Sequence, residues 1–134
     1  MEQGAWSREK GKRLSEKQFR FQDFEIWKKA VSLSGLLFEI VEELDKKRLF
    51  RFAEQLRGAT MSITNNIAEG SGSLSDAEFA NFLNMARRSV FEVANILILL
   101  RQDGKINSTD VESLLQELEQ ESRMILAFRN SLKC

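Results

Sequence analysis

The stretch QLRGATMSITNNIAEGSG, at positions 55–72, combines a helical apolar pattern with small and polar residues. Its inner face has the spacing of one side of a helix and consists of Leu56, Ile63 and Ile67. The small residues between them, such as Gly58, allow a helix backbone to approach its neighbours closely. A buried amide needs a partner, because an unpaired one costs about 1–3 kcal/mol. The stretch therefore predicts a helix that carries Asn65 and Asn66 into contacts between helices or between subunits.

Two helices are expected in the first half of the chain. The first begins near Asp23, whose side chain can cap the free backbone donors of the first turn, and continues to about Lys46. The second extends from about Phe50 to Glu69 and contains the quoted stretch. It ends at Gly70, which suits the left-handed C-terminal position that glycine occupies without steric penalty.

Two more helices are expected in the second half. Ser75, followed three residues later by Glu78, has the spacing of a capping box and opens the third helix, which Gly104 closes. Thr109 and Glu112 repeat that spacing at the start of a fourth helix. The inner face of the third helix is predicted to consist of Phe79, Leu83, Ala86, Val90, Val93, Leu97 and Leu100. That of the fourth is predicted to consist of Val111, Leu114, Leu115, Leu118, Ile125 and Phe128.

Four helices joined by short loops predict an all-α fold, an antiparallel up-down-up-down four-helix bundle over residues 21–134. Residues 1–20 lack this periodicity, and we expect them to form a flexible tail that can be removed without loss of folding. The tail has six basic and three acidic side chains, a net charge of +3 in a chain with no net charge overall. Arg13 and Arg20 could contact a nucleic-acid backbone, or the tail could simply be a solvated leader.

The apolar surface exceeds what one bundle needs. The first helix carries a second apolar stripe through Trp27, and the third ends in an unbroken apolar run at residues 96–100, which includes Ile96 and Ile98. A helix in a monomeric bundle needs only one stripe, so the surplus predicts a homo-oligomer with these residues and Glu69 at helix or subunit interfaces. The alternative is that long charged side chains cover the excess.

The residue inventory argues against catalysis. The chain has no histidine, no tyrosine and a single cysteine, the terminal Cys134. The usual neutral-pH base, the common nucleophile pairs and Cys/His zinc sites are therefore excluded. We expect no catalytic residues, no cofactor and no metal. The lack of a disulfide pair, of a secretory signal and of a long apolar run predicts a cytoplasmic protein that does not enter a membrane.

Arginines are the main candidates for partner contacts, because the planar guanidinium group can donate two parallel hydrogen bonds to a phosphate. Arg101 lies fourteen residues after Arg87, so both should point the same way from the third helix. The other interpretation is that these side chains form ion pairs on a solvated face. The full set of candidates in the helical region is Arg51, Arg57, Arg87, Arg88 and Arg101.

Three segments resemble a bacterial family, the 23S rRNA-intervening sequence proteins. FQDFEIWKKA at 21–30 is similar to the family's opening F-x-D-L-x-V-W-x-K-A, and the quoted stretch at 55–72 is similar to Q-L-R-R-A-x-x-S-I-x-x-N-I-A-E-G. EFANFLNMARRSVFEVANIL at 78–97 is similar to E-F-x-x-F-L-x-x-A-x-G-S-x-x-E. The N-I-A-E-G string is the most specific of these matches.

The resemblance implies a four-helix bundle that assembles as a ring-shaped homopentamer. The same fold serves as the accessory variability determinant of diversity-generating retroelements, where the pentamer binds a reverse transcriptase and its template RNA. By analogy, the resemblance implies a non-enzymatic oligomeric adaptor that binds RNA or a nucleic-acid enzyme. The alternative left open is an oligomeric scaffold that binds only protein. Neither a membrane nor a small-molecule substrate is expected as a partner.

Overall fold

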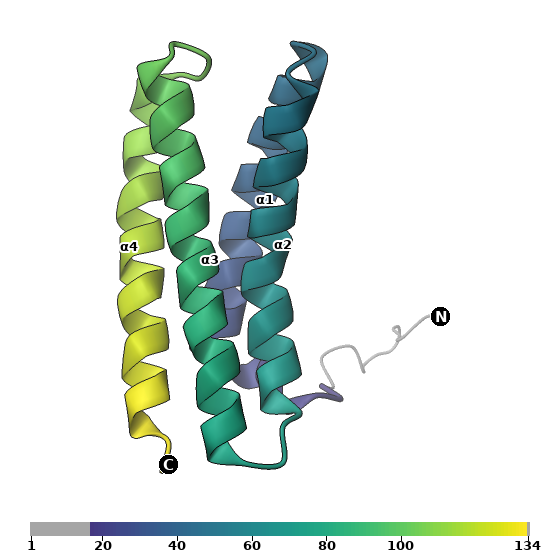
Figure 1. The fold of residues 1–134 in the computed structure, drawn as a ribbon, viewed down its shortest axis with the longest axis vertical. Helices are drawn as coiled ribbons and strands as arrows, with labels where there is room; N and C mark the ends of the chain where they lie inside the picture. The colour runs from purple at the N-terminus through teal and green to yellow at the C-terminus, as the bar shows by residue number, and fades with distance from the viewer. Residues whose placement is uncertain (1–16, 134) are drawn as a thin grey trace, which may run out of the picture.

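Four long helices make up almost all of the structure, a computed structural model that describes residues 17–133. A short 3-10 helix, η1 (Arg20–Asp23), leads into α1 (Glu25–Lys46), α2 (Phe50–Ser71), α3 (Asp76–Gln102) and α4 (Ser108–Ser131). Successive helices run antiparallel (Figure 1), and α1 packs less closely against α4 than neighbouring helices in the sequence pack against each other. No strand occurs between residues 17 and 133. In this part of the chain no helix is apolar over a length sufficient to cross a lipid bilayer.

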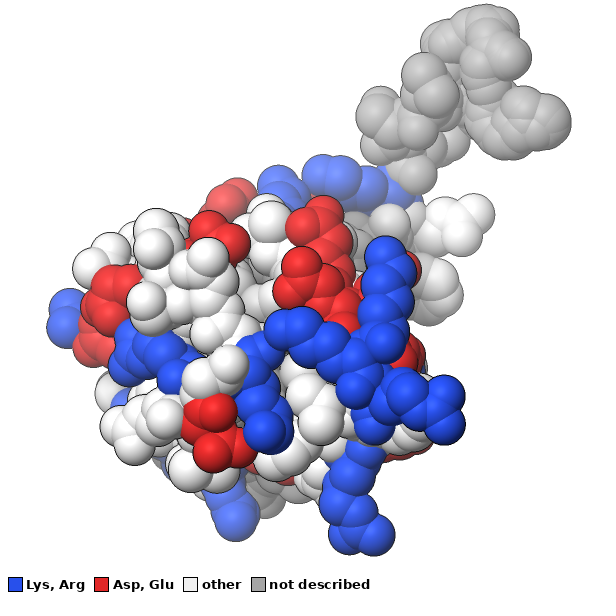
Figure 2. Space-filling view, turned by 90° about the horizontal axis from the view of Figure 1, so that it is seen from above, with Lys and Arg blue, Asp and Glu red and all other residues white. Residues whose placement is uncertain are grey.

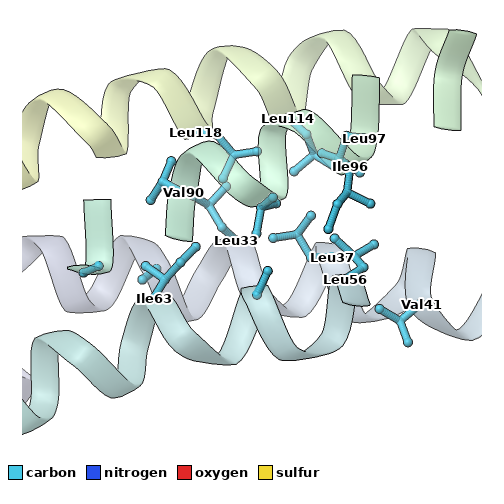
Figure 3. Close-up of a cluster of buried hydrophobic side chains, with 14 of the residues drawn as sticks. Leu33, Leu37, Val41, Leu56, Ile63, Val90, Ile96, Leu97, Leu114 and Leu118 are labelled. Carbon is cyan, nitrogen blue, oxygen red and sulfur yellow. The ribbon is translucent and has the colours of Figure 1, made fainter. Parts of the chain in front are cut away.

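One hydrophobic core runs along the bundle and confirms the predicted inner faces of α2 and α3. On α4 two of the predicted residues, Leu115 and Phe128, are only half-buried. Every residue predicted for the inner face of α3 is buried, as are the three predicted from α2 in the quoted stretch. Figure 3 shows side chains from all four helices meeting in this core. The α1 contributors are Ile26, Ala30, Leu33, Leu37, Val41 and Leu44. Burial of these side chains holds the fold together, because each fully buried leucine or isoleucine contributes about 1.5–3 kcal/mol.

The structure corrects two of the predicted helix starts. Asp23 ends η1 and does not cap α1, because its carboxylate is paired with Lys17 at 2.8 Å and Phe24 occupies the cap position. At α4 the cap is Asn107, whose side chain accepts a hydrogen bond from the Thr109 N–H at 2.8 Å. Thr109 therefore lies inside the helix. The predicted cap of α3 is confirmed, since Ser75 Oγ accepts from the backbone N–H three residues later at 3.1 Å.

Gly70 has a different role from the one predicted. It lies within α2 and is buried, and a Cβ atom at this position would stand 2.6 Å from Phe82 Cβ and 2.9 Å from the Phe79 ring. Gly70 is thus the point of close approach between α2 and α3, and the helix cap is Gly72 with a φ of −89°. Gly58, predicted as a close-approach residue, is exposed, and a Cβ atom at this position would have no neighbouring atom within 4 Å.

Two turns at the same end of the bundle use the left-handed backbone conformation. Gly104 closes α3 with a φ of 71°, as predicted, and the next N–H donates back to the Leu100 carbonyl at 2.9 Å. At the α1–α2 turn the corresponding residue is Arg48, with a φ of 63°. A side chain at such a position costs about 1–2 kcal/mol relative to glycine.

Candidate interaction surfaces

An apolar groove lies between α1 and α2. Its volume is about 720 Å³ and its wall includes Trp27, the predicted interface tryptophan. The second apolar stripe of α1 opens into this groove, where Val31 is 43% exposed and Phe38 is 36% exposed, and Met61 of α2 is 46% exposed opposite them. Gly35 and the predicted interface residue Asn65 also line it. The expected surplus of apolar surface on α1 therefore exists in the folded chain.

A second apolar groove lies between α3 and α4. It has a volume of about 230 Å³ and is lined mainly by aliphatic side chains, with Ile98 on its wall and Phe91, which is 56% exposed, at its edge. The predicted apolar run at residues 96–100 divides between core and surface. Ile96 is buried in the core of the single chain (Figure 3), as are Leu97 and Leu100. Only Ile98 and Leu99 of this run remain accessible.

The two grooves face away from each other. In Figure 1 the α1–α2 pair forms one side of the bundle and the α3–α4 pair forms the other. One groove belongs wholly to the first pair and the other wholly to the second. The chain thus presents two different apolar surfaces on opposite sides.

A polar contact joins α2 and α3 between these sides. Asn66 Nδ2 donates to the backbone carbonyl and the hydroxyl of Ser62 at 2.9 and 3.0 Å, and the Ser62 hydroxyl is 2.8 Å from the Ser89 hydroxyl of α3. Asn66 thus bonds within α2, and only the Ser62 hydroxyl reaches α3. The role of Asn66 at a helix or subunit interface stays a prediction. Asn65 and Glu69 are exposed, and their side chains form no hydrogen bond with another described residue.

The side between α1 and α4 is acidic. A groove of about 590 Å³ runs along it, between Leu36 and Ile40 of α1 and the first turns of α4. Carboxylates project into this groove from both helices, and they repel any polyanion that approaches from this side. They are Glu39, Glu43, Asp110 and Glu117.

Two of the predicted partner-binding arginines are engaged in ion pairs within the chain. Arg57 pairs with Asp45 of α1 at 2.9 Å and also with Glu54 one turn earlier. Arg101 pairs with Glu112 of α4 at 3.0 Å. Both ion pairs link neighbouring helices, so the guanidinium groups of Arg57 and Arg101 are only partly available to bind a phosphate.

Arg87 and Arg88 point to different sides of α3. The Arg87 guanidinium donates to the Ser122 carbonyl of α4 at 3.2 Å and lies 5.0 Å from the centre of the Phe91 ring. It lies on the α4 side like Arg101, as the spacing predicted. Arg88 is exposed beside the α2–α3 polar contact and makes no side-chain hydrogen bond or ion pair with another described residue.

Arg20 belongs to the bundle and not to a free tail. Its guanidinium donates two hydrogen bonds to the Ser71 carbonyl, at 3.0 and 2.8 Å, and lies over the rings of Phe24 and Phe79. The predicted tail, residues 1–20, therefore includes at its end a residue that ties η1 to α2 and α3. Arg13 lies outside the described residues.

Arg51 is exposed at the start of α2, in a basic cluster that sequence reasoning did not single out. Lys46, Lys47 and Arg48 precede it at the α1–α2 turn, and all are exposed. Figure 2 looks onto this end of the bundle and shows lysine and arginine side chains across it, with acidic side chains between them. A basic run at 46–48 is visible in the sequence, but its proximity to Arg51 depends on the turn.

Glu121 is a buried carboxyl that sequence reasoning also missed. The side chain is fully buried on α4, and neither carboxylate oxygen has a hydrogen-bond partner in the described structure. Burial raises the pKa of Glu121 from 4.5 to about 8, and the positive charge of Lys29 opposes that rise. Between residues 17 and 133 no group of three or more acidic or cysteine side chains has the geometry to hold a metal ion. The raised pKa favours the neutral form of the Glu121 carboxyl in the folded chain.

The fold and these surfaces define an antiparallel four-helix bundle with polar helix contacts and two opposed apolar sides. The sequence profile of the 23S rRNA-intervening sequence protein family matches residues 22–127, so the chain belongs to this family.

A crystal structure of a protein of unknown function from the S23 ribosomal protein family of Bacteroides thetaiotaomicron is similar to the fold of this chain. That structure has a TM-score of 0.75 and 21% sequence identity, with 79% of this chain and 99% of that chain covered. At this identity the likeness concerns the fold. No curated protein matches the sequence.

Proposed function

We propose that this protein is a non-enzymatic, homo-oligomeric adaptor that binds RNA or a nucleic-acid enzyme such as a reverse transcriptase. The observation that carries the proposal is the pair of apolar surfaces on opposite sides of the bundle. When a second molecule covers the exposed aromatic and aliphatic side chains of both surfaces, the free energy of the system falls.

The placement of the two surfaces favours head-to-tail assembly. Surfaces that differ in residues and lie on opposite sides of a subunit form heterologous contacts, which close into a ring when the rotation per subunit divides a full turn. Phe91 and Ile98 on the α3–α4 side would enter the groove beside Trp27 on the next subunit. Five subunits per ring is our proposal by resemblance to the ring-shaped pentamers of this fold.

The adaptor role rests on the family and on charge. The family is named for proteins of 23S rRNA-intervening sequences, and the same fold serves as the accessory protein of retroelement reverse transcriptases. Exposed cations occur at Arg88 and at the α1–α2 turn with Arg51. A ring would repeat each cationic site in every subunit, and such repetition raises the overall affinity for a long polyanion, since later contacts become intramolecular.

Assembly can be tested by filling the α1–α2 groove without disturbing the bundle. Gly35 lines this groove, and a Cβ atom at this position would meet no atom of another part of the chain within 4 Å. We expect Gly35→Gln to leave the helix content unchanged and to reduce the mass measured by light scattering. Ser32→Gln, an exposed position three residues earlier in the same helix, is the control and should keep the wild-type mass. Equal masses for both variants would place the interface elsewhere.

RNA binding can be tested by filter binding across a salt series. Affinity that depends on phosphate contacts falls steeply as salt is added, because bound counterions are released on binding. We expect the full-length protein to retain RNA on the filter and to lose it progressively with added salt. Retention that does not change with salt would argue against phosphate contacts.

The second candidate is an oligomeric scaffold that binds only protein. It is favoured by the intramolecular engagement of Arg20, Arg57, Arg87 and Arg101. A purified protein that carries no nucleic-acid absorbance and does not respond to added RNA would select this candidate over the adaptor for RNA.

A further inference from the structure

The geometry points to the α1–α2 end of the bundle as a site for single-stranded nucleic acid, at which one unpaired base stacks on Phe50 and the backbone phosphates contact Lys46, Lys47, Arg48 and Arg51. The inference rests on the proposed RNA-binding function and locates it on a surface. Single-stranded nucleic-acid sites combine cations that follow the backbone with aromatic rings on which bases stack. Both components are present at this turn.

The aromatic component is Phe50, the first residue of α2. It is 53% exposed, so its ring is open to solvent and not packed in the core. The Arg48 guanidinium lies over one face of the ring, 5.8 Å from its centre, so a base would stack on the other face or take the place of the guanidinium. A base that stacks on this ring brings its own phosphates within reach of the adjacent cations.

The cations at this turn form no ion pair with the acidic groups near them. Asp45 is paired with Arg57, Asp103 with Lys105 and Glu112 with Arg101. By contrast, the basic side chains at 46–48 and Arg51 form no ion pair with another described residue. Lys47 donates to the Lys105 carbonyl at 2.8 Å, which fixes the α1–α2 turn against the α3–α4 turn and holds the cluster in place. Glu42 precedes Lys46 by one helical turn without pairing to it.

Arg48 occupies a position that favours glycine for stability. Its φ of 63° lies in the left-handed region, where a side chain is disfavoured. The positive charge complements the C-terminus of α1, but Lys46 and Lys47 already supply that charge. We take the arginine in this strained position to serve a contact that depends on its side chain.

The site should discriminate between nucleic-acid forms. A duplex keeps its bases stacked within the helix, so it cannot offer one to Phe50, whereas a single strand can. The acidic α1–α4 groove below the turn would repel a strand that left the cationic end along that side. A single strand is therefore expected to lie across the end of the bundle and not along its length.

Fluorescence anisotropy with the full-length protein and a labelled oligouridylate of about 12 nucleotides tests the site, since the length is within the range that one single-strand module covers. We expect Phe50→Ala to weaken binding about tenfold. Phe19→Ala is the matched control, because Phe19 is 61% exposed near the opposite end of the bundle, and it should bind like wild type. Arg51→Gln should reduce the slope of log affinity against log salt by about one.

Arg48→Gly separates binding from folding. It removes the left-handed strain, so the melting temperature should rise by about 4 °C, while affinity for the oligouridylate falls about fivefold. If Phe50→Ala and Arg48→Gly both bind the oligouridylate as tightly as wild type does, this site is overturned, while the adaptor function still stands. Equal affinity for a duplex of the same length would overturn the stacking contact. If wild type binds neither oligouridylate nor oligothymidylate, the single-strand site is overturned, and the filter-binding experiment decides the RNA-binding function separately. Tighter binding of oligouridylate than of oligothymidylate would assign the site to RNA.

Discussion

Gly70 of α2 lies so close to Phe82 of α3 that a Cβ atom at position 70 would stand 2.6 Å from Phe82 Cβ. The Phe82 Cβ is attached to the backbone and cannot move without a shift of the helix. We therefore expect Gly70→Ala to lower the free energy of unfolding by about 2 kcal/mol, the overpacking cost reduced by the better helix propensity of alanine. Urea unfolding followed by circular dichroism measures this change.

Gly58→Ala is the matched comparison in the same helix. No atom lies within 4 Å of the added methyl group, so only the helix propensity changes and the free energy of unfolding should rise by about 1 kcal/mol. If both alanine variants were destabilised equally, the close approach of α2 and α3 would not be specific to Gly70.

The buried carboxyl of Glu121 predicts a pH dependence of stability. Its pKa is raised to about 8 in the folded chain, so between that value and the ordinary 4.5 the folded state holds a proton that the unfolded state has lost. Stability from this group is complete below about pH 4.5 and is lost as the pH rises through about 8, with a slope of at most about 1.4 kcal/mol per pH unit. Glu121→Gln cannot ionise and should lose this slope in urea unfolding at a series of pH values.

Glu119→Gln controls for the loss of a carboxylate on the same helix. Glu119 is exposed and pairs with Arg123 at 2.8 Å, an interaction worth less than about 1 kcal/mol at the surface. The free energy of unfolding of Glu119→Gln should therefore depend on pH in the same way as that of wild type. A Glu121→Gln variant with the wild-type slope would show that the carboxyl of Glu121 reaches solvent.

Arg20 is predicted to stabilise the lower end of the bundle. Replacement by alanine removes two hydrogen bonds to the Ser71 carbonyl and the contacts with the Phe24 and Phe79 rings, so the melting temperature should fall by about 4 °C. A chain that begins at Lys17 keeps Arg20 and should melt like the full-length protein. A melting temperature unchanged by Arg20→Ala would contradict the contact.

The core was predictable because burial follows a period. Leu83, Val90 and Leu97 recur every seven residues, and this spacing alone places them on one side of a helix that must face its neighbours. The second stripe of α1 was found in the same way, through Val31 and Phe38, which line the α1–α2 groove.

Contacts between distant residues were not predictable from one sequence. Arg87 could have paired with a phosphate or with the chain itself, and only the placement of α4 shows that its guanidinium meets the Ser122 carbonyl. Gly70 has the residue type of a helix end, but the position of the Phe82 side chain makes it a packing residue. Glu121 lies at seam spacing between Leu118 and Ile125, so its position was accessible from the period. The burial of a carboxylate there contradicts the preference of glutamate for solvent.

The central claim is that the two opposed apolar sides are covered by other copies of the chain, and sedimentation equilibrium of the full-length protein at micromolar concentration tests it most directly. We expect one species with a mass that is a whole multiple of the 15.4 kDa chain, five times that value for the pentamer. A folded species of 15.4 kDa that persists at every concentration would contradict it.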